Sequence, residues 1–276
     1  METENKFNNL KKHLEQLKSV AVAYSGGVDS TFLLKVARDV LGDNVIAVTA
    51  HSSIHPEREF REAVNFVRKS GIRHMVITSE EVDSETFANN PPDRCYHCKR
   101  ELLAKIIEVA QSNNIQHIVE GSNVDDTDDY RPGTKAVKEL GISSPLKEAG
   151  LGKEDIRILS QKMNLPTWNK PAFACLASRF PYGQKITKDK LHVVDQAEQY
   201  LMDSGFKQVR VRHHGDIARI EVPAAERNKF FDMKLMDGVH EKFKQLGFMY
   251  TALDLKGYRT GSMNEVIAAA VRKRNR

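Results

Sequence analysis

The sequence predicts an α/β protein, with a parallel sheet covered by helices on both faces and a second, smaller α+β domain. Short apolar runs such as 20–24 and 45–48 alternate with segments of helical periodicity. Several of these runs are apolar at every position, which is typical of strands buried on both faces. The order of elements changes beyond 168–171. We therefore expect domains at 1–174 and 175–276.

The first domain is predicted to alternate strand and helix along the chain. The run 20–24 predicts a strand, and an apolar face from Phe32 to Val40 predicts a helix that ends near Gly42. The segment 80–94 has few core residues, so we expect a surface loop that ends just before a helix. The remaining strands are predicted at 45–48, 75–77 and 117–119, and the remaining helices at 56–70 and 99–113.

The second domain mixes helices with a hairpin. A helix is predicted at 188–204, and the strand-like segments 209–212 and 219–222 are expected to pair across the turn between them. Two further helices are predicted within 224–245, followed by a last strand at 249–255. This order differs from the regular alternation of the first domain.

A glycine-rich loop lies between the first strand and the first long helix. Adjacent glycines allow a close approach to a ligand, and the following helix N-terminus favours an anion such as a nucleotide phosphate. The loop lacks the lysine of a Walker A motif and the spacing of a dinucleotide fingerprint. The residues predicted to bind ATP here are Ser25, Gly26, Gly27, Val28, Asp29 and Ser30.

Two more segments are expected at the same edge of the sheet. Ligands of parallel α/β sheets bind at the carboxyl ends of the strands, so 25–30, 50–53 and 121–129 should meet in one crevice. We therefore add Ser52 and Gly121 to the predicted ATP site. Asp29 and Asp126 are predicted Mg²⁺ ligands, because Mg²⁺ prefers carboxylates together with phosphate oxygens.

Composition sets broad limits on the class of protein. The chain has 276 residues, 40% of them hydrophobic, and a net charge of +5. No stretch approaches the ~18 consecutive apolar residues of a membrane span, so we expect a cytoplasmic protein without a membrane partner. The charge favours anionic ligands but does not indicate nucleic-acid binding, and we interpret the basic segment 272–276 as a solvated terminus.

Three cysteines form the second notable group: Cys95, Cys98 and Cys175. Both segments that carry them follow the carboxyl side of the predicted sheet, so the thiols could converge. Three thiolates can bind an iron–sulfur cluster and leave one iron open, or they can bind zinc together with His97. Cys175 also fits a simple packing role, because it lies among Ala174, Leu176 and Ala177.

Five motifs carry a resemblance to a known family. The loop alone resembles the SGGxDS loop of PP-loop ATP pyrophosphatases, which have an adenine nucleotide α-hydrolase-like fold. All five motifs together resemble the LarE family. They are SGGVDS at 25–30, CYHCK at 95–99, DDYRPG at 128–133, ACLASRFPYG at 174–183 and VRVR at 209–212.

The resemblance implies a sulfur transferase. LarE proteins use ATP to convert carboxylates of pyridinium-3,5-biscarboxylic acid mononucleotide into thiocarboxylates, with AMP and pyrophosphate as products, for the nickel-pincer cofactor of lactate racemase. In one branch a single cysteine gives up its own sulfur. In another, three cysteines hold a 4Fe-4S cluster that carries the sulfide, and the resemblance places Cys95, Cys98 and Cys175 in this branch.

The implied substrate and partners follow from the same motifs. A small anionic mononucleotide suits arginine, so Arg179, Arg210 and Arg212 are the predicted substrate ligands, and Arg210 and Arg212 share one face of a strand. Weaker candidates are Arg131, Tyr182 and Lys185. The resemblance also implies a sulfide source and a homo-oligomer.

Four alternatives remain open at this stage. The chain could be a PP-loop enzyme that thiolates tRNA, although no RNA-binding module is evident, or a LarE protein that sacrifices the sulfur of Cys175. It could also be an amide-forming ligase with zinc on its cysteines, or a nucleotide-binding sensor without catalytic activity.

Overall fold

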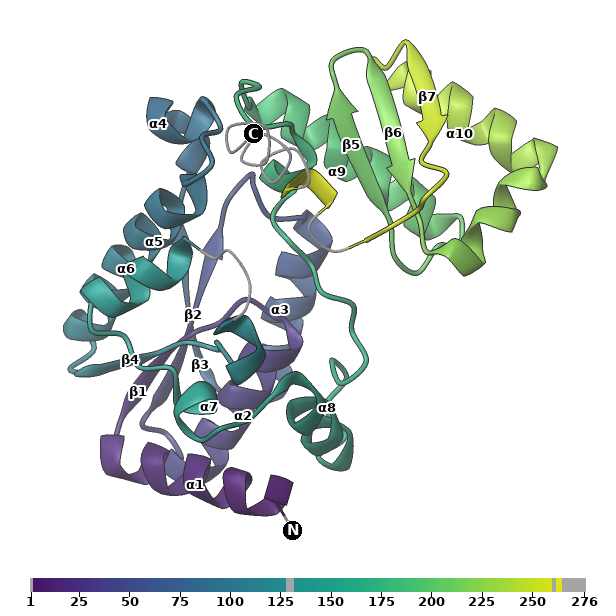
Figure 1. Cartoon of the computed structure of the whole chain (residues 1–276). Helices are drawn as coiled ribbons and strands as arrows, with labels where there is room; N and C mark the ends of the chain where they lie inside the picture. Colours follow the sequence, from purple (N-terminus) through teal and green to yellow (C-terminus); the bar gives the residue numbers. More distant parts are fainter. Residues whose placement is uncertain (1, 128–131, 260–261, 265–276) are drawn as a thin grey trace, which may run out of the picture. The chain divides into compact units, whose positions relative to one another are not determined.

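The computed structural model describes residues 2–127, 132–259 and 262–264. The chain divides into two compact units (Figure 1). The first is formed by 1–87 and 92–173, and the second by 88–91 and 174–276. In the described part of the chain no helix is both long and apolar enough to cross a membrane.

The first unit is built on a sheet of four parallel strands in the order β3-β2-β1-β4 (Figure 1). The strand order reverses between β1 and β4, so their carboxyl ends form the topological switch point where α/β folds bind ligands. The predicted parallel α/β class is confirmed. The strands are β1 (Val20–Ala23), β2 (Val45–His51), β3 (Arg73–Thr78) and β4 (His117–Val119).

Helices cover both faces of this sheet, because alternate strand residues point to opposite sides. Val20 and Val22 join a cluster with Phe32, whereas Ala21 joins a second cluster with Leu103. The first cluster packs under α1 (Glu2–Leu17), α2 (Val28–Leu41), α3 (Glu57–Lys69) and α8 (Lys153–Lys162), and the second under α5 (Arg94–Ser112) and α6 (Gly133–Glu139). The shorter elements are η1 (Glu81–Asp83), α4 (Glu85–Ala88), η2 (Val124–Thr127) and α7 (Pro145–Glu148).

The expected start of the helix after 80–94 was wrong. Helix α5 begins at Arg94, so Cys95 and Cys98 lie within its first five residues and not in a preceding loop. The segment before it is also not a plain loop, since it contains η1 and α4. The pair Pro91-Pro92 prevents the preceding helix from continuing, and no proline interrupts the chain from Arg94 to Ser112.

The second unit has a three-stranded sheet in the order β5-β6-β7, with an antiparallel and a parallel pair. The predicted hairpin is present, with residues 215 and 216 between its strands. The first of the two helices expected within 224–245 is a 3-10 helix, and Asp232 caps the second through bonds from the N–H groups of Lys234 and Leu235. The elements are η3 (Leu176–Arg179), α9 (Lys188–Asp203), β5 (Arg210–His214), β6 (Ile217–Glu221), η4 (Ala224–Phe231), α10 (Met233–Gln245), β7 (Tyr250–Leu253) and η5 (Ser262–Asn264).

Candidate active site

The loop between β1 and α2 is shaped by two glycines with different roles. Gly26 has a φ of +74°, and a Cβ at this position would lie 2.8 Å from the Cβ of Ala63 on α3. Any L residue there would be strained and would clash. Gly27 is the N-cap of α2 and has no side chain that could accept a hydrogen bond from the first-turn N–H groups of the helix. The first-turn N–H groups of α2 are therefore available to an anion.

The hydroxyl groups of the loop face one another. The Oγ atoms of Ser25 and Ser30 are 3.1 Å apart, and the N–H of Ser25 donates to Ser30 Oγ at 3.3 Å. Gly121 follows β4 and approaches this loop closely, since a Cβ at Gly121 would lie 3.0 Å from the nitrogen of Ser30. The structure thus brings Gly121 together with residues 25–30, the predicted phosphate loop, at the switch point between β1 and β4.

Asp29 forms an ion pair with Lys153, the first residue of α8. The Nζ of Lys153 bonds Asp29 Oδ2, whereas Oδ1 of Asp29 is buried and has no hydrogen-bond partner among the described residues. Burial raises the pKa of Asp29, Lys153 opposes this rise, and the nearby carboxylate of Asp126 adds to it. An unpartnered buried oxygen beside a second carboxylate fits the predicted Mg²⁺ role of Asp29 and Asp126.

The main chain of Lys153 is held in place by Asp125. The N–H of Lys153 donates to Asp125 Oδ2 at 2.7 Å. A Cβ at Gly152 would lie 3.2 Å from the same carboxylate oxygen, so the α8 N-terminus packs tightly against the loop after β4. Helix α8 therefore delivers an ammonium group to a phosphate loop that contains no lysine.

Ser52 lies directly after β2 and is buried. Its hydroxyl donates to the carboxylate of Glu81, which is 1% exposed. The thiol of Cys98 lies 4.0 Å from the other oxygen of Glu81. The predicted nucleotide residue Ser52 and the predicted cluster ligand Cys98 are thus linked through one buried carboxylate in the first unit.

Cys95 and Cys98 lie near the start of α5, three residues apart, so their side chains share one face of the helix. Cys95 is exposed and Cys98 is half-buried. His97 does not share this face, because neighbouring helix residues point in different directions, and its Nε2 lies 3.4 Å from Asp93. The helix geometry therefore suits two thiolate ligands better than a set that includes His97.

Cys175 belongs to the second unit, where it is half-buried just before η3. The Arg179 guanidinium donates to the carbonyls of Ala174 and Cys175 at 2.7 and 2.9 Å. Its other nitrogens form a two-bonded pair with Glu198 at 2.9 and 2.8 Å. Arg179 is fully buried, and its partners are Glu198 of α9 and the main chain around Cys175.

Arg210 and Arg212 are also buried, at 3% and 5% exposure. Arg212 bonds Glu221 at 2.6 Å, and the Arg210 guanidinium lies 5.3 Å from the ring centre of Tyr258. Burial, together with the positive charges of Arg179 and Arg212, lowers the pKa of Arg210 to about 10. A guanidinium that is destabilised by like charges favours an anionic ligand.

The three cysteines are divided between the units, with Cys95 and Cys98 in the first and Cys175 in the second. In neither unit do the described residues contain three His, Cys, Asp or Glu side chains grouped as a metal site. The three-thiol site stays a prediction. The weaker candidate Arg131 lies outside the described residues.

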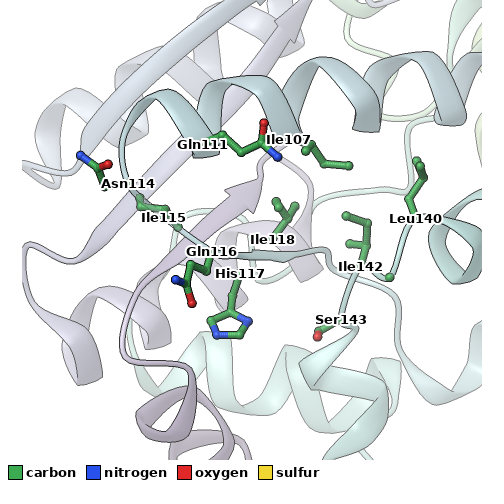
Figure 2. A pocket seen from close by; sticks show the side chains of 11 residues that line it. Ile107, Gln111, Asn114, Ile115, Gln116, His117, Ile118, Leu140, Ile142 and Ser143 are labelled. Atoms are coloured by element: carbon green, nitrogen blue, oxygen red, sulfur yellow. The ribbon is translucent and has the colours of Figure 1, made fainter.

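A cavity of about 550 Å³ lies away from the phosphate loop, at the amino end of β4. Figure 2 shows Ile107 and Gln111 of α5 together with His117, Ile118 and Ile142. Its walls carry no aspartate, glutamate, lysine or arginine among the described residues. This cavity therefore lacks the charged groups that a nucleotide triphosphate requires.

Several residues of the site were not predicted from the sequence. Lys153 and Lys170 reach the phosphate loop, and Glu81, Glu198 and Glu221 pair with predicted site residues. The one signal in the sequence was that the loop lacks a Walker-type lysine, which indicates that another part of the chain supplies a positive charge to the phosphates. Nothing in the sequence indicated which lysine supplies it.

Residues 2–167 match the sequence model of the NAD synthase family. Together with the SGGVDS loop at the switch point, this match defines the first unit as a PP-loop domain that uses ATP. Relatives that match nearly the whole chain narrow the family assignment. The chain is 43% identical over 265 residues to uncharacterized protein slr1717 of Synechocystis, a match that covers 96% of this chain and 98% of that protein.

A second relative carries a functional name. Over 258 residues the chain is 42% identical to the pyridinium-3,5-bisthiocarboxylic acid mononucleotide synthase of Lactiplantibacillus plantarum, and the match covers 93% of each protein. A GMP synthase of Aeropyrum pernix is 26% identical over 71% of this chain and 41% of its own length. The chain belongs to the LarE family, as its motifs predicted, and is an ATP-using enzyme.

Proposed function

We propose that the protein is an ATP-dependent sulfur transferase that converts carboxylates of pyridinium-3,5-biscarboxylic acid mononucleotide into thiocarboxylates. The observation that carries this proposal is the 42% identity, over nearly the whole chain, to a relative named as the bisthiocarboxylic acid mononucleotide synthase. The product would serve the nickel-pincer cofactor of lactate racemase. The proposed location is the cytoplasm, and the proposed assembly is a homo-oligomer.

The first half-reaction takes place at the phosphate loop. A substrate carboxylate oxygen attacks the α-phosphorus of ATP, the bond to the bridging oxygen breaks, and pyrophosphate leaves with the electron pair. The first-turn amides of α2 and the Lys153 ammonium are placed to stabilise this developing charge. Asp29 and Asp126 would hold Mg²⁺, which neutralises phosphate charge when bound.

The second half-reaction replaces AMP by sulfur. A sulfide attacks the acyl carbon, and AMP leaves, so the carboxylate oxygen is exchanged for sulfur without any change in oxidation state. A 4Fe-4S cluster on three cysteines leaves one iron without a protein ligand, and that iron can carry the sulfide. Cys95, Cys98 and Cys175 would hold it, and the shared helix face of the first two fits adjacent ligands.

The second unit is the proposed substrate-binding unit. Burial and the nearby charges of Arg179 and Arg212 disfavour the charged form of Arg210, and an anionic ligand there would offset this cost. Arg210 and Arg212 are the proposed ligands of the mononucleotide phosphate. Arg179 has its contacts with Glu198 and the Cys175 segment, so we propose that it orients this segment as well as adding to the positive field.

The decisive experiment uses protein reconstituted anaerobically with iron and sulfide. Incubation with ATP, Mg²⁺, sulfide and the biscarboxylic acid mononucleotide should release AMP and pyrophosphate, and mass spectrometry should detect sulfur-for-oxygen exchange in the substrate. Turnover that exceeds one sulfur per chain, with the mass of Cys175 unchanged, supports the cluster route. Conversion of Cys175 to dehydroalanine would instead establish the sacrificial route, and zinc without iron or labile sulfide would contradict the cluster.

A further inference from the structure

Lys170 lies in the first unit, on the segment that leads to Cys175. Its Nζ bonds the carboxylates of Glu59 and Glu62 on α3 at 2.7 and 2.9 Å, and the carbonyl of Gly26 in the phosphate loop at 3.3 Å. An ammonium has three N–H donors, so these acceptors can use all of them. The side chain is 12% exposed. Lys170 therefore connects this segment both to α3 and to the loop.

The main chain of the same segment is held from another direction. Arg157 of α8 donates to the carbonyls of Trp168 and Lys170 at 2.7 and 2.9 Å. Residues 168–170 lie outside the helices and strands, so no ladder of backbone bonds fixes them. Local turn bonds run from the N–H of Trp168 to the carbonyl of Leu165 and from the N–H of Lys170 to that of Thr167. Arg157 and Lys170 tie the segment to other elements, and of these two side chains only Lys170 bonds the phosphate loop.

The bond to Gly26 also determines how the loop presents a donor. In a trans peptide the C=O and N–H point in opposite directions, so fixing the carbonyl of Gly26 fixes the N–H of Gly27 away from Lys170. A Gly-Gly peptide rotates at low cost without such a restraint. The Gly26–Gly27 peptide thus has two roles. Its C=O accepts a hydrogen bond from Lys170, which anchors the segment before Cys175, and its N–H can donate to a phosphate.

We propose that Lys170 is a positioning residue that couples ATP binding at the loop to the order of residues 168–173, the chain leading to Cys175. The inference rests on the proposed function, in which ATP is used at the loop and sulfur chemistry occurs at Cys175. Because coupling is reciprocal, ATP orders this segment and the anchored segment strengthens ATP binding by the same factor. An enzyme that must bring a sulfur donor to a fresh adenylate gains from such a link.

Hydrogen exchange of a peptide covering 168–173, measured by mass spectrometry with and without Mg-ATP, tests the coupling. In the wild type ATP should slow this exchange about tenfold, and Lys170→Met should abolish the response and weaken ATP binding about tenfold by calorimetry. Lys162→Met removes the same charge near the end of α8 and is the matched control. It should behave as the wild type does.

An ATP response in Lys170→Met equal to that of the wild type would overturn the proposal. Because loss of the ammonium could destabilise the fold by leaving Glu59 buried and charged, the double variant Glu59→Gln/Lys170→Met serves as a second test. It should also lose the response, whereas Glu59→Gln alone should retain it. These assays contain neither sulfide nor mononucleotide, so their outcome does not depend on whether sulfur transfer is observed.

Discussion

Alanine should strongly destabilise the protein at one of the two adjacent glycines of the phosphate loop and have almost no effect at the other. At Gly26 the φ of +74° costs an L residue about 1–2 kcal/mol, and a Cβ 2.8 Å from that of Ala63 adds about 1–3 kcal/mol of overpacking. The more restricted unfolded chain returns about 0.4–1 kcal/mol. We therefore expect Gly26→Ala to lower the free energy of unfolding of the first unit by about 1–5 kcal/mol.

Gly27→Ala is the matched comparison. Gly27 has a φ of −76°, and the nearest atom to an added Cβ is Ser25 Oγ at 3.5 Å, an ordinary contact. Alanine is a somewhat poorer N-cap than glycine, which roughly cancels the gain of about 0.4–1 kcal/mol from the unfolded chain. The free energy of unfolding should change by less than about 0.5 kcal/mol.

Urea unfolding followed by tryptophan fluorescence measures both effects. The only tryptophan of the sequence, Trp168, lies in the first unit, so its emission reports the unit that carries the loop. Adding Ala63→Gly to Gly26→Ala should recover part of the loss by removing the clash, despite the cost of about 1 kcal/mol of a glycine within α3. Equal effects of alanine at Gly26 and Gly27 would refute this reasoning.

Three further predictions concern charged and ionisable groups. Lys153→Met should weaken ATP binding about tenfold in metal-free buffer, whereas Lys162→Met should not, as calorimetry would show. Burial raises the pKa of Tyr24 to about 12, so the unfolded chain ionises first as pH rises above 10, and about 2 kcal/mol of stability is lost by pH 12. Tyr24→Phe should remove this loss, measured as the change in the free energy of urea unfolding between pH 9 and pH 11. An equal change in the wild type and in Tyr24→Phe would contradict the prediction. Arg179→Met should destabilise the second unit by about 3–5 kcal/mol, because Glu198 would stay buried and unpaired, and hydrogen exchange across α9 would reveal it.

The parallel sheet and the phosphate loop could be read from local pattern. Apolar runs alternate with helical periodicity, and a strand, two glycines and a helix start follow one another at 20–31. Helix α5 shows the limit of such reasoning. Its first five residues, Arg94 to Cys98, have no apolar periodicity, so the sequence pattern did not show where the helix starts.

The two lysines that bond to the phosphate loop illustrate why tertiary structure was needed. Lys153 and Lys170 are separated from Asp29 and Gly26 by 124 and 144 residues, and no local pattern relates them. Arg179 is a similar case, since the sequence showed an arginine suited to an anion but not the buried Glu198 that binds it.

Residue order along the chain thus sufficed for the features that depend on backbone conformation and periodicity: the fold class, the glycine loop and the Cys-x-x-Cys pair. The tertiary structure determined which charged side chains from distant parts of the chain contact these features. The residues next to a lysine in the sequence do not show whether it is solvated or pairs with a buried aspartate. The electrostatics of the site therefore come from packing between elements, above all from α8 and the segment after it.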